Sequence, residues 1–392
     1  MEVVGWIFFV FALLASVMFH EFGHFWTARR FGMKTPQFFL GFGPTLWSIH
    51  RGETEYGIKA LPLGGFVRIT GMTPLEDAEL SATDRERAFY RQRPRHRAIV
   101  LGAGSFMHFV LAIVLLLVIA MGLGVAKPTT TIGRIATCVP ASATASDCPS
   151  GAPASPAAKA GLKSGEKIVA FGGTEVTDWD QLTAAITAHP PGPAQVTVER
   201  GGERVTVTAD LASVPGRKGS YLGVTPEMHN DRLGPVDAVS YAVGIMGETF
   251  AGVGKVIVAL PASLPNLFSP DRGSNPEGSA SSIVGAADIT GQIVAADSSW
   301  QAKTATLLYL VVSLNVFVGV FNLLPLLPLD GGHLAVLCWE RIRGGIARMR
   351  GRPDPGPVDM TKLAPATVVV IAALIGLGVL LVLADIVNPI KL

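Results

Sequence analysis

The stretch from Val3 to Ala28 reads VVGWIFFVFALLASVMFHEFGHFWTA, and only His20, Glu21 and His24 interrupt its run of uncharged residues. About 20 helical residues cross the roughly 30 Å of hydrocarbon in a bilayer, so this stretch is long enough to span a membrane. A secretory signal peptide is the alternative, but such a peptide has a basic region before its apolar part. Here no Lys or Arg precedes Arg29. We therefore expect a retained membrane anchor.

The composition of the whole chain agrees with a membrane protein. Of its 392 residues, 49% are hydrophobic and 16% are charged, with a mean hydropathy of +0.42, whereas about 25% of residues are charged in soluble domains. A single soluble domain is therefore not expected. The net charge of +2, from 32 basic and 30 acidic residues, indicates no nucleic-acid partner. Three cysteines are too few for a disulfide-based scaffold.

Three further stretches are apolar enough and long enough to cross a bilayer. They are Ala98–Ala126, Thr304–Leu329 and Leu363–Ala384. Another apolar stretch, Val256–Pro270, is short and contains two prolines, so we expect an interfacial piece rather than a fifth span. The sequence thus predicts an α-helical polytopic membrane protein with four transmembrane helices. Helical periodicity in Gly234–Ala251 predicts a helix along the membrane surface.

Arginines near the span ends predict the orientation, because basic residues accumulate on the cytoplasmic side. The loop 29–97 and the loop after the third span both carry such clusters, so both are expected in the cytoplasm. Both chain termini and the segment 127–303 are then extracytoplasmic. The clustered residues are Arg29, Arg30, Arg85, Arg87, Arg91, Arg93, Arg95 and Arg97 in the first loop, and Arg341, Arg343, Arg348, Arg350 and Arg352 in the second.

The cysteines fall on the two sides of the membrane in this topology. Cys138 and Cys148 lie in the extracytoplasmic segment, where oxidising conditions permit a bridge. Gly, Ser, Pro and Ala between them allow the loop to close, so a disulfide is favoured over two free thiols. Cys338 is cytoplasmic and is expected to stay a free thiol.

The pattern His-Glu-x-x-His at His20, Glu21 and His24 is typical of a zinc site. Residues i and i+4 of a helix lie about 40° apart, so both imidazoles can reach one metal ion. Glu21 lies next to them and can take a proton from a water that the metal activates. A solvated polar helix face is the alternative. It is disfavoured here, because a charged acid inside an apolar span costs about 2.5 to 3.5 kcal/mol unless it has partners and a function.

A catalytic zinc needs a third protein ligand. The candidate is Asp330, in the stretch NLLPLLPLDGGH that runs from Asn322 to His333. The predicted topology places it at the same depth as His20 and His24. Pro325 and Pro328 interrupt helical hydrogen bonding there, which is tolerated only inside a protein or around a cavity. The alternative is that Asp330 is an ordinary turn residue at the end of the third span.

Together these two motifs resemble the site-2 protease family of intramembrane zinc metalloproteases, in the bacterial branch that cleaves anti-sigma factors. The resemblance implies that His20, His24 and Asp330 bind Zn²⁺ and that Glu21 is the general base. Asn322 and Pro325 match positions that hold an extended substrate. The segment LPLGGFVR, with Gly64 and Gly65, is similar to a membrane-associated hairpin that binds substrate as a strand. The family often has an Asn in the second span, where this chain has His108. We expect His108 to be a hydrogen-bonded packing residue.

The segment from 128 to 226 alternates apolar and polar residues between glycine-rich turns. A short helix and strand around SPAAKAGLKSGEKIVAF, a hairpin across Gly201-Gly202, and a helix containing Trp179 and Leu182 resemble a circularly permuted PDZ domain. Ala141–Ala157 and Ser269–Ser282 are predicted to be loop and connector. The expected divisions are a first core part at 1–126, the PDZ-like α+β domain at 127–230, a linker region at 231–303, and a second core part at 304–392.

The resemblance implies hydrolysis of a peptide bond within the transmembrane segment of a single-span protein in the bacterial cytoplasmic membrane. The expected partners are the bilayer and single-span substrates such as anti-sigma factors or remnant signal peptides, after another protease has removed the outside domain. A membrane scaffold with a PDZ domain is one alternative. A metal transporter or sensor is another, although transporters usually contain inverted repeats and this sequence contains none.

Overall fold

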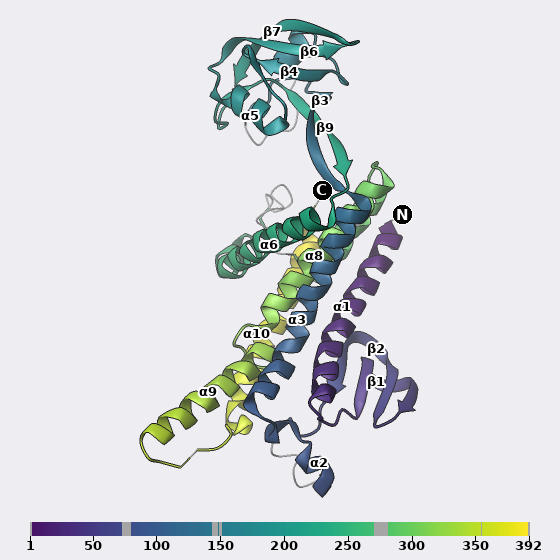
Figure 1. The fold of residues 1–392 in the computed structure, drawn as a ribbon, viewed down its shortest axis with the longest axis vertical. Coiled ribbons are helices and arrows are strands. Elements are labelled where there is room, and N and C mark those ends of the chain that lie inside the picture. The colour runs from purple at the N-terminus through teal and green to yellow at the C-terminus, as the bar shows by residue number, and fades with distance from the viewer. Residues whose placement is uncertain are drawn as a thin grey trace. The chain divides into compact units, whose positions relative to one another are not determined.

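The computed structural model describes residues 2–72, 80–142, 148, 151–269, 281–353 and 355–390. The chain divides into two compact units (Figure 1). Unit 1 comprises Met1–Ile119 and Pro235–Leu392, and unit 2 comprises Ala120–Gly234. Most of the expected connector 269–282 and part of the expected loop 141–157 lie outside the described residues. The four expected divisions of the chain stay predictions.

Unit 1 is built on three apolar helices that approach one another at glycines. They are α1 (Glu2–Arg30), α3 (Pro94–Val118) and α8 (Trp300–Asn322), and α3 packs against both of the others. A Cβ atom added to Gly23 would lie 2.6 Å from the carbonyl oxygen of Ala103, and one added to Gly319 would lie 2.6 Å from the ring of Phe109. Small residues permit such close approach, which is a principal source of attraction between helices in lipid.

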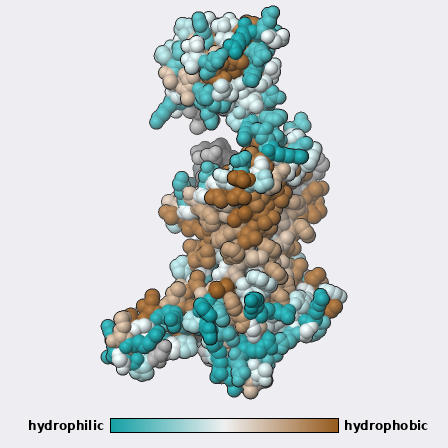
Figure 2. All heavy atoms as spheres, viewed as in Figure 1, coloured by the Kyte–Doolittle hydropathy of each residue, from teal (hydrophilic) through white to brown (hydrophobic). Residues whose placement is uncertain are grey.

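Five helical segments in the described part of the chain are long and apolar enough to cross a membrane. They are Glu2–Arg30, Pro94–Leu123, Pro235–Asn266, Trp300–Asn322 and Met360–Val387. The chain is therefore a polytopic membrane protein, and hydrophobic side chains form a broad band over the middle of unit 1 (Figure 2). Four of the segments coincide with the four expected spans, and the count of four stays a prediction.

The additional segment corrects one feature of the sequence analysis. We expected a surface helix at 234–251 and a separate interfacial piece at 256–270, but α6 is one continuous helix over Pro235–Ser263. Pro261 lies in its last turn, where a missing N–H removes one hydrogen bond without dividing the helix. The helix continues into a 3₁₀ turn over Leu264–Asn266.

The third expected span also ends earlier than its apolar run. Helix α8 stops at Asn322, because Pro325 has no N–H and disfavours helical backbone in the residue before it. The chain then turns through 323–329, with a cis peptide bond between Leu327 and Pro328, and enters α9 at Asp330–Met349. Helix α10 covers Ala364–Val387 after a 3₁₀ turn at Met360–Leu363.

The short helix α7 (Ile283–Ala295) is fastened on two sides. The backbone N–H of Ser282, at its start, donates to Oδ2 of Asp385 in α10 at 2.6 Å. A Cβ on Gly5 of α1 would lie 2.6 Å from the carbonyl oxygen of Thr290 in α7. Both ends of the chain therefore pack on this helix.

Two long antiparallel strands follow α1. They are β1 (Gln37–Arg51) and β2 (Thr54–Arg68), and both bend so that the first part of β1 is paired on two sides. Gln37 lies opposite both Glu55 and Arg68, and Leu40 lies opposite both Ile58 and Gly65. The hairpin expected at Leu61–Arg68 is thus half of a larger sheet. A short helix α2 (Ala82–Glu86) and a 3₁₀ turn at Phe89–Arg91 lead into α3.

Unit 2 is a small α+β domain with an antiparallel sheet and two short helices, α4 and α5. Its strands lie in the order β8-β7-β6-β4-β3-β9, with β5 paired to β4. Buried Ile168, Leu182, Val196 and Val198 lie in its core. The elements are β3 (Val125–Ile135), α4 (Pro156–Lys159), β4 (Lys167–Phe171), β5 (Thr174–Glu175), α5 (Trp179–Ala188), β6 (Gly192–Arg200), β7 (Glu203–Ser213), β8 (Ser220–Tyr221) and β9 (Val224–Asp231).

Two local predictions for this unit are confirmed. Strands β6 and β7 form a hairpin closed by the pair Arg200 and Glu203, and both intervening glycines have positive φ. Helix α5 contains Trp179 and Leu182, as the sequence indicates. The assignment of this unit to the PDZ class stays a prediction.

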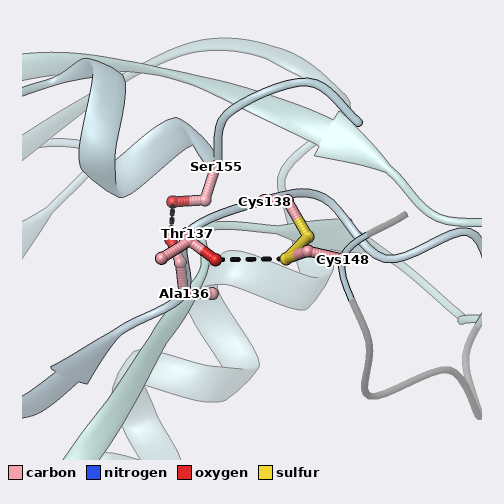
Figure 3. The surroundings of a disulfide bond; sticks show 5 residues. All are labelled: Ala136, Thr137, Cys138, Cys148 and Ser155. Atoms are coloured by element: carbon pink, nitrogen blue, oxygen red, sulfur yellow. Dashed lines mark hydrogen bonds between the residues drawn. A yellow bond between two sulfur atoms is a disulfide. The ribbon is translucent and has the colours of Figure 1, made fainter. Parts of the chain in front are cut away.

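A disulfide joins Cys138 to Cys148, which confirms the expected bridge (Figure 3). The Thr137 hydroxyl lies 3.1 Å from Sγ of Cys148, and the Ser155 hydroxyl donates to the carbonyl of Ala136 at 2.5 Å. The bridge therefore ties the chain after β3 to the loop that returns toward α4. Cys338, in α9, is a free and exposed thiol.

Replacing Cys138 with Ser should destabilise unit 2 by about 2 to 3 kcal/mol, because closing a loop of this length restricts the unfolded chain by that amount. Thermal unfolding of the purified chain, monitored by hydrogen exchange in the strands of unit 2, measures the loss of stability. Cys338→Ser is the control and should change stability by less than about 0.5 kcal/mol. Equal stability of the Cys138→Ser variant and the native chain would contradict the expectation.

Candidate metal centre

Helix α1 brings two imidazoles to one point near its C-terminal end. His20 and His24 are separated by one helical turn, and their Nε2 atoms are 3.1 Å apart. Their residues are only 8% and 7% exposed. The carboxylate of Asp330, the first residue of α9, completes the group, with Oδ2 3.3 Å from His20 Nε2 and 3.2 Å from His24 Nε2.

This triangle fits a zinc ion. Ligand atoms about 2.0 to 2.1 Å from zinc stand about 3.3 to 3.4 Å apart at the corners of a tetrahedron, close to the three observed separations. The buried Oδ2 atom of Asp330 has no hydrogen-bond partner within the described part of the chain. A cation bound between the two imidazole nitrogens and this carboxylate oxygen would satisfy all three buried polar atoms at once. Within the described residues, these three form the candidate metal group.

The tautomer of His24 follows from the hydrogen bond that its Nδ1 atom makes. His24 Nδ1 lies 2.7 Å from the carbonyl oxygen of Val100 in α3, and a carbonyl only accepts. Nδ1 therefore carries the proton, which leaves the lone pair of Nε2 directed at the other two atoms. Such a carbonyl partner typically orients a metal-binding imidazole.

Helix α3 packs directly against the two imidazoles at Gly104. A Cβ atom there would lie 2.4 Å from His24 Nε2 and 2.6 Å from His20 Nε2. No side chain fits in that space without displacing both imidazoles. Neither Gly104 nor the Val100 carbonyl belongs to a motif that marks it as part of the site. The run of small residues GAGS at 102–105, within an otherwise bulky span, is the signal that points to a close approach.

Glu21, the second residue of the motif, is half-buried and faces the sheet. Its Oε2 accepts a hydrogen bond of 3.0 Å from the backbone N–H of Val67 in β2. A Cβ on Gly65 would lie 2.7 Å from Met18 Sδ and 3.4 Å from Glu21 Cγ. The structure therefore brings the Gly-Gly part of β2 directly onto α1 beside the motif. Gly64, with φ of 152°, allows the bend in β2 that precedes this contact.

The turn before Asp330 depends on close packing by two glycines. A Cβ on Gly331 would lie 2.3 Å from the carbonyl carbon of Leu323, and one on Gly332 would lie 2.6 Å from that of Leu326. The first turn of α9 thus lies against the chain that leads into it, which positions the aspartate. Asn322 is half-buried and Pro325 is exposed in this turn. No hydrogen bond joins either of them to the three clustered residues in the described structure, so their role stays a prediction.

A buried polar chain lies beside the metal group. His108 Nδ1 is 2.7 Å from Asn315 Oδ1, and Asn315 Nδ2 donates to the hydroxyl of Ser16 at 3.0 Å. The ring of His108 packs 5.0 Å from that of His20. This chain connects α3, α8 and α1, and it confirms the expectation that His108 is a hydrogen-bonded packing residue.

A His-Glu-x-x-His motif on a membrane-spanning helix, completed by an aspartate from a distant element, defines a membrane-embedded metallopeptidase. The sequence model of Peptidase family M50 matches residues 8–353, and the chain belongs to this family of site-2 proteases. It is similar to zinc metalloprotease Rip1 of Mycobacterium tuberculosis strain H37Rv, with 38% identity over all of this chain and 99% of the relative. Rip1 of Mycolicibacterium smegmatis is 38% identical over 99% of this chain and 98% of the relative.

A more distant relative agrees with this assignment. Zinc metalloprotease RasP of Geobacillus kaustophilus is 30% identical over 86% of this chain and 89% of its own length. The protein is therefore a zinc-dependent metallopeptidase. The two alternatives, a non-catalytic scaffold and a metal transporter or sensor, are not favoured.

Gly104→Ala should lower zinc affinity by about 10- to 100-fold, the usual effect of disturbing the support of a metal ligand. The added methyl group overlaps the two imidazole nitrogens. Gly102→Ala, two residues away on the same helix, is the control, because a Cβ there meets nothing within 4 Å. Zinc binding by both variants is measured by competition with a chelator. Equal affinities would contradict the proposed packing.

Asp330→Asn should reduce bound zinc well below one ion per chain, because an amide of the same shape does not supply the negative charge that the cluster needs. The metal content of the purified variant, by elemental mass spectrometry, tests this. Asp180→Asn changes an exposed aspartate in unit 2 and should retain its zinc. Full occupancy in Asp330→Asn would exclude Asp330 as a ligand.

Proposed function

We propose that this zinc protease hydrolyses a peptide bond within the transmembrane segment of single-span membrane proteins. The observation that carries the proposal is the convergence of His20, His24 and Asp330 inside a bundle of apolar helices, where an extended membrane segment is the available polypeptide. Anti-sigma factors and remnant signal peptides are the substrates that the family resemblance favours, after another protease has removed the outside domain.

Each residue of the cluster has one task in this proposal. His20, His24 and Asp330 hold the zinc ion, and the Val100 carbonyl keeps His24 in the binding tautomer. Bound zinc supplies Lewis acidity toward water and the scissile carbonyl. Glu21 accepts a proton from the attacking water and delivers it to the amide nitrogen, so that the C–N bond breaks to give a carboxyl group and an amine.

The position of β2 supports a binding role for Gly64 and Gly65. The second half of β2 pairs with β1 along one edge, and on the Glu21 side its Val67 N–H meets a carboxylate rather than another strand. An unwound substrate added along this edge would hydrogen-bond to main chain and pass next to Glu21. Asn322 and Pro325, in the turn before Asp330, would then contact the same extended segment.

The proposed orientation places the metal group near the cytoplasmic face, with unit 2 and both chain termini outside the cell. The arginine-rich loops at 29–97 and 341–352 support it. So does the disulfide of unit 2, because such bonds persist in oxidising compartments. Unit 2 is proposed to be a PDZ domain that either binds peptides or excludes substrates that still carry bulky outside domains.

Glu21→Gln should lower the cleavage rate by about 10²- to 10⁴-fold, the usual contribution of a general base. The variant is coexpressed with a tagged single-span substrate from which the outside domain has been removed, and the product is followed by its change in size. Bound zinc should stay near one ion per chain, because the proposed ligands are intact.

Glu227→Gln, an exposed position in β9, is the matched control and should cleave normally. Cleavage at the native rate by Glu21→Gln would exclude the proposed role. Zinc retained without any cleavage by the native chain would instead favour the scaffold alternative.

A further inference from the structure

A groove of about 730 Å³ lies between the start of α3 and helix α9, away from the metal group. Its floor is apolar, and three arginines stand around it. Arg93, Arg95 and Ala98 line it from the α3 side, and Leu334, Arg341 and Ile342 line it from α9. The groove therefore lies at the end of a candidate membrane span, where lipid headgroups meet the hydrocarbon.

The arginines of the groove differ from neighbouring arginines in their partners. Arg93, Arg95 and Arg341 are exposed, and none of them forms an ion pair with any described residue. By contrast, Arg97 donates to Glu340 at 3.1 Å, and Arg343 donates to the carbonyl of Gly356 at 2.6 Å. Arg97 and Arg343 thus hold α9 in place. The three groove arginines instead leave positive charge around an apolar surface.

Helix α9 carries an apolar stripe that continues from this groove. Trp339, Ile342, Ile346 and Met349 lie within about 80° of one another on the helix at 100° per residue. They are 56%, 55%, 38% and 82% exposed. Leu337 is buried in the core shared with α3, so this helix is anchored on one side and presents the stripe on another. Figure 1 shows that α9 extends sideways from the bundle.

We propose that this groove binds a phospholipid with an anionic headgroup. The headgroup phosphate is held by Arg93, Arg95 and Arg341, and an acyl chain lies along Leu334 and Ala98. Charge complementarity favours an anionic ligand. A free phosphate would leave the apolar floor uncovered, whereas an acyl chain covers it and continues into the bilayer beside Ile342. The stripe places α9 in the membrane interface, as expected of an amphipathic helix flanked by basic residues.

Native mass spectrometry of the delipidated full chain tests the proposal. The probes are phosphatidylglycerol and phosphatidylcholine with identical acyl chains. We expect phosphatidylglycerol to bind the native chain at least several-fold more tightly. Each arginine near an anionic surface contributes about a fivefold effect, so Arg95→Gln with Arg341→Gln should weaken phosphatidylglycerol binding about thirtyfold. Excess inorganic phosphate should not displace the lipid.

The matched control is Arg350→Gln with Arg352→Gln, which removes the same charge beyond the end of α9 and outside the groove. It should keep the native preference. A native chain that binds both lipids equally, or a groove variant that keeps the preference, overturns the proposal. So does displacement of phosphatidylglycerol by inorganic phosphate, which would indicate an anion site only.

A second measurement places the lipid without relying on any arginine variant. Cys338 lines the groove and is the free thiol of the chain, so a small fluorophore attached there reports on its neighbours. Brominated phosphatidylglycerol should quench it at several-fold lower mole fraction than brominated phosphatidylcholine. Equal quenching by the two lipids contradicts the proposal. Neither measurement depends on proteolysis, so a failure here leaves the proposed function untouched.

Discussion

The convergence of two imidazoles and one carboxylate within an apolar bundle is the constraint on which the rest of unit 1 depends. Three buried polar atoms about 3.2 Å apart are costly in an apolar bundle unless a bound cation or a shared proton satisfies them, so the fold must hold them in place. Gly104 lets α3 press against both imidazoles, and Gly331 lets α9 start beside the turn that precedes Asp330. The glycines of this bundle are therefore determined by the site as much as by helix packing.

The sheet formed by β1 and β2 supplies free backbone N–H groups, which the helices lack. Helices satisfy their own backbone groups and offer an incoming chain no free N–H groups, whereas the edge of a strand offers a row of them. Because β1 and β2 bend, the first half of β2 is paired with β1 on both sides, whereas the second half is paired on one side only. The other side of the second half lies beside Glu21, to which the backbone N–H of Val67 donates. The proposed general base and a potential strand partner for the substrate thus lie side by side.

Local patterns predicted most of the site and much of the fold. The spacing of His20 and His24, and the isolated charge of Asp330, predicted one metal cluster, because ligands inside an apolar segment need partners. The hairpin at Gly201-Gly202 was likewise predictable from its turn residues. The features that could not be predicted depend on contacts between segments that are far apart in the sequence. Gly104 acquires its role only when α3 touches α1, and the double pairing of β1 arises from bends that alternation of residues does not encode. The continuity of α6 could not be predicted, because the effect of Pro261 depends on whether it lies in the interior of a helix or in its last turn.

The order of the site residues along the chain bears on how the protein is made. His20 and His24 lie in α1, but Asp330 follows only after α3, all of unit 2, α6 and α8. A partly synthesised chain therefore has two of the three proposed zinc ligands, and its α1 has not yet met all the helices that pack on it in the complete fold. The proposed zinc site cannot be completed before Asp330 is made, so hydrolytic capacity arises only after all of unit 2 and most of unit 1 have been synthesised.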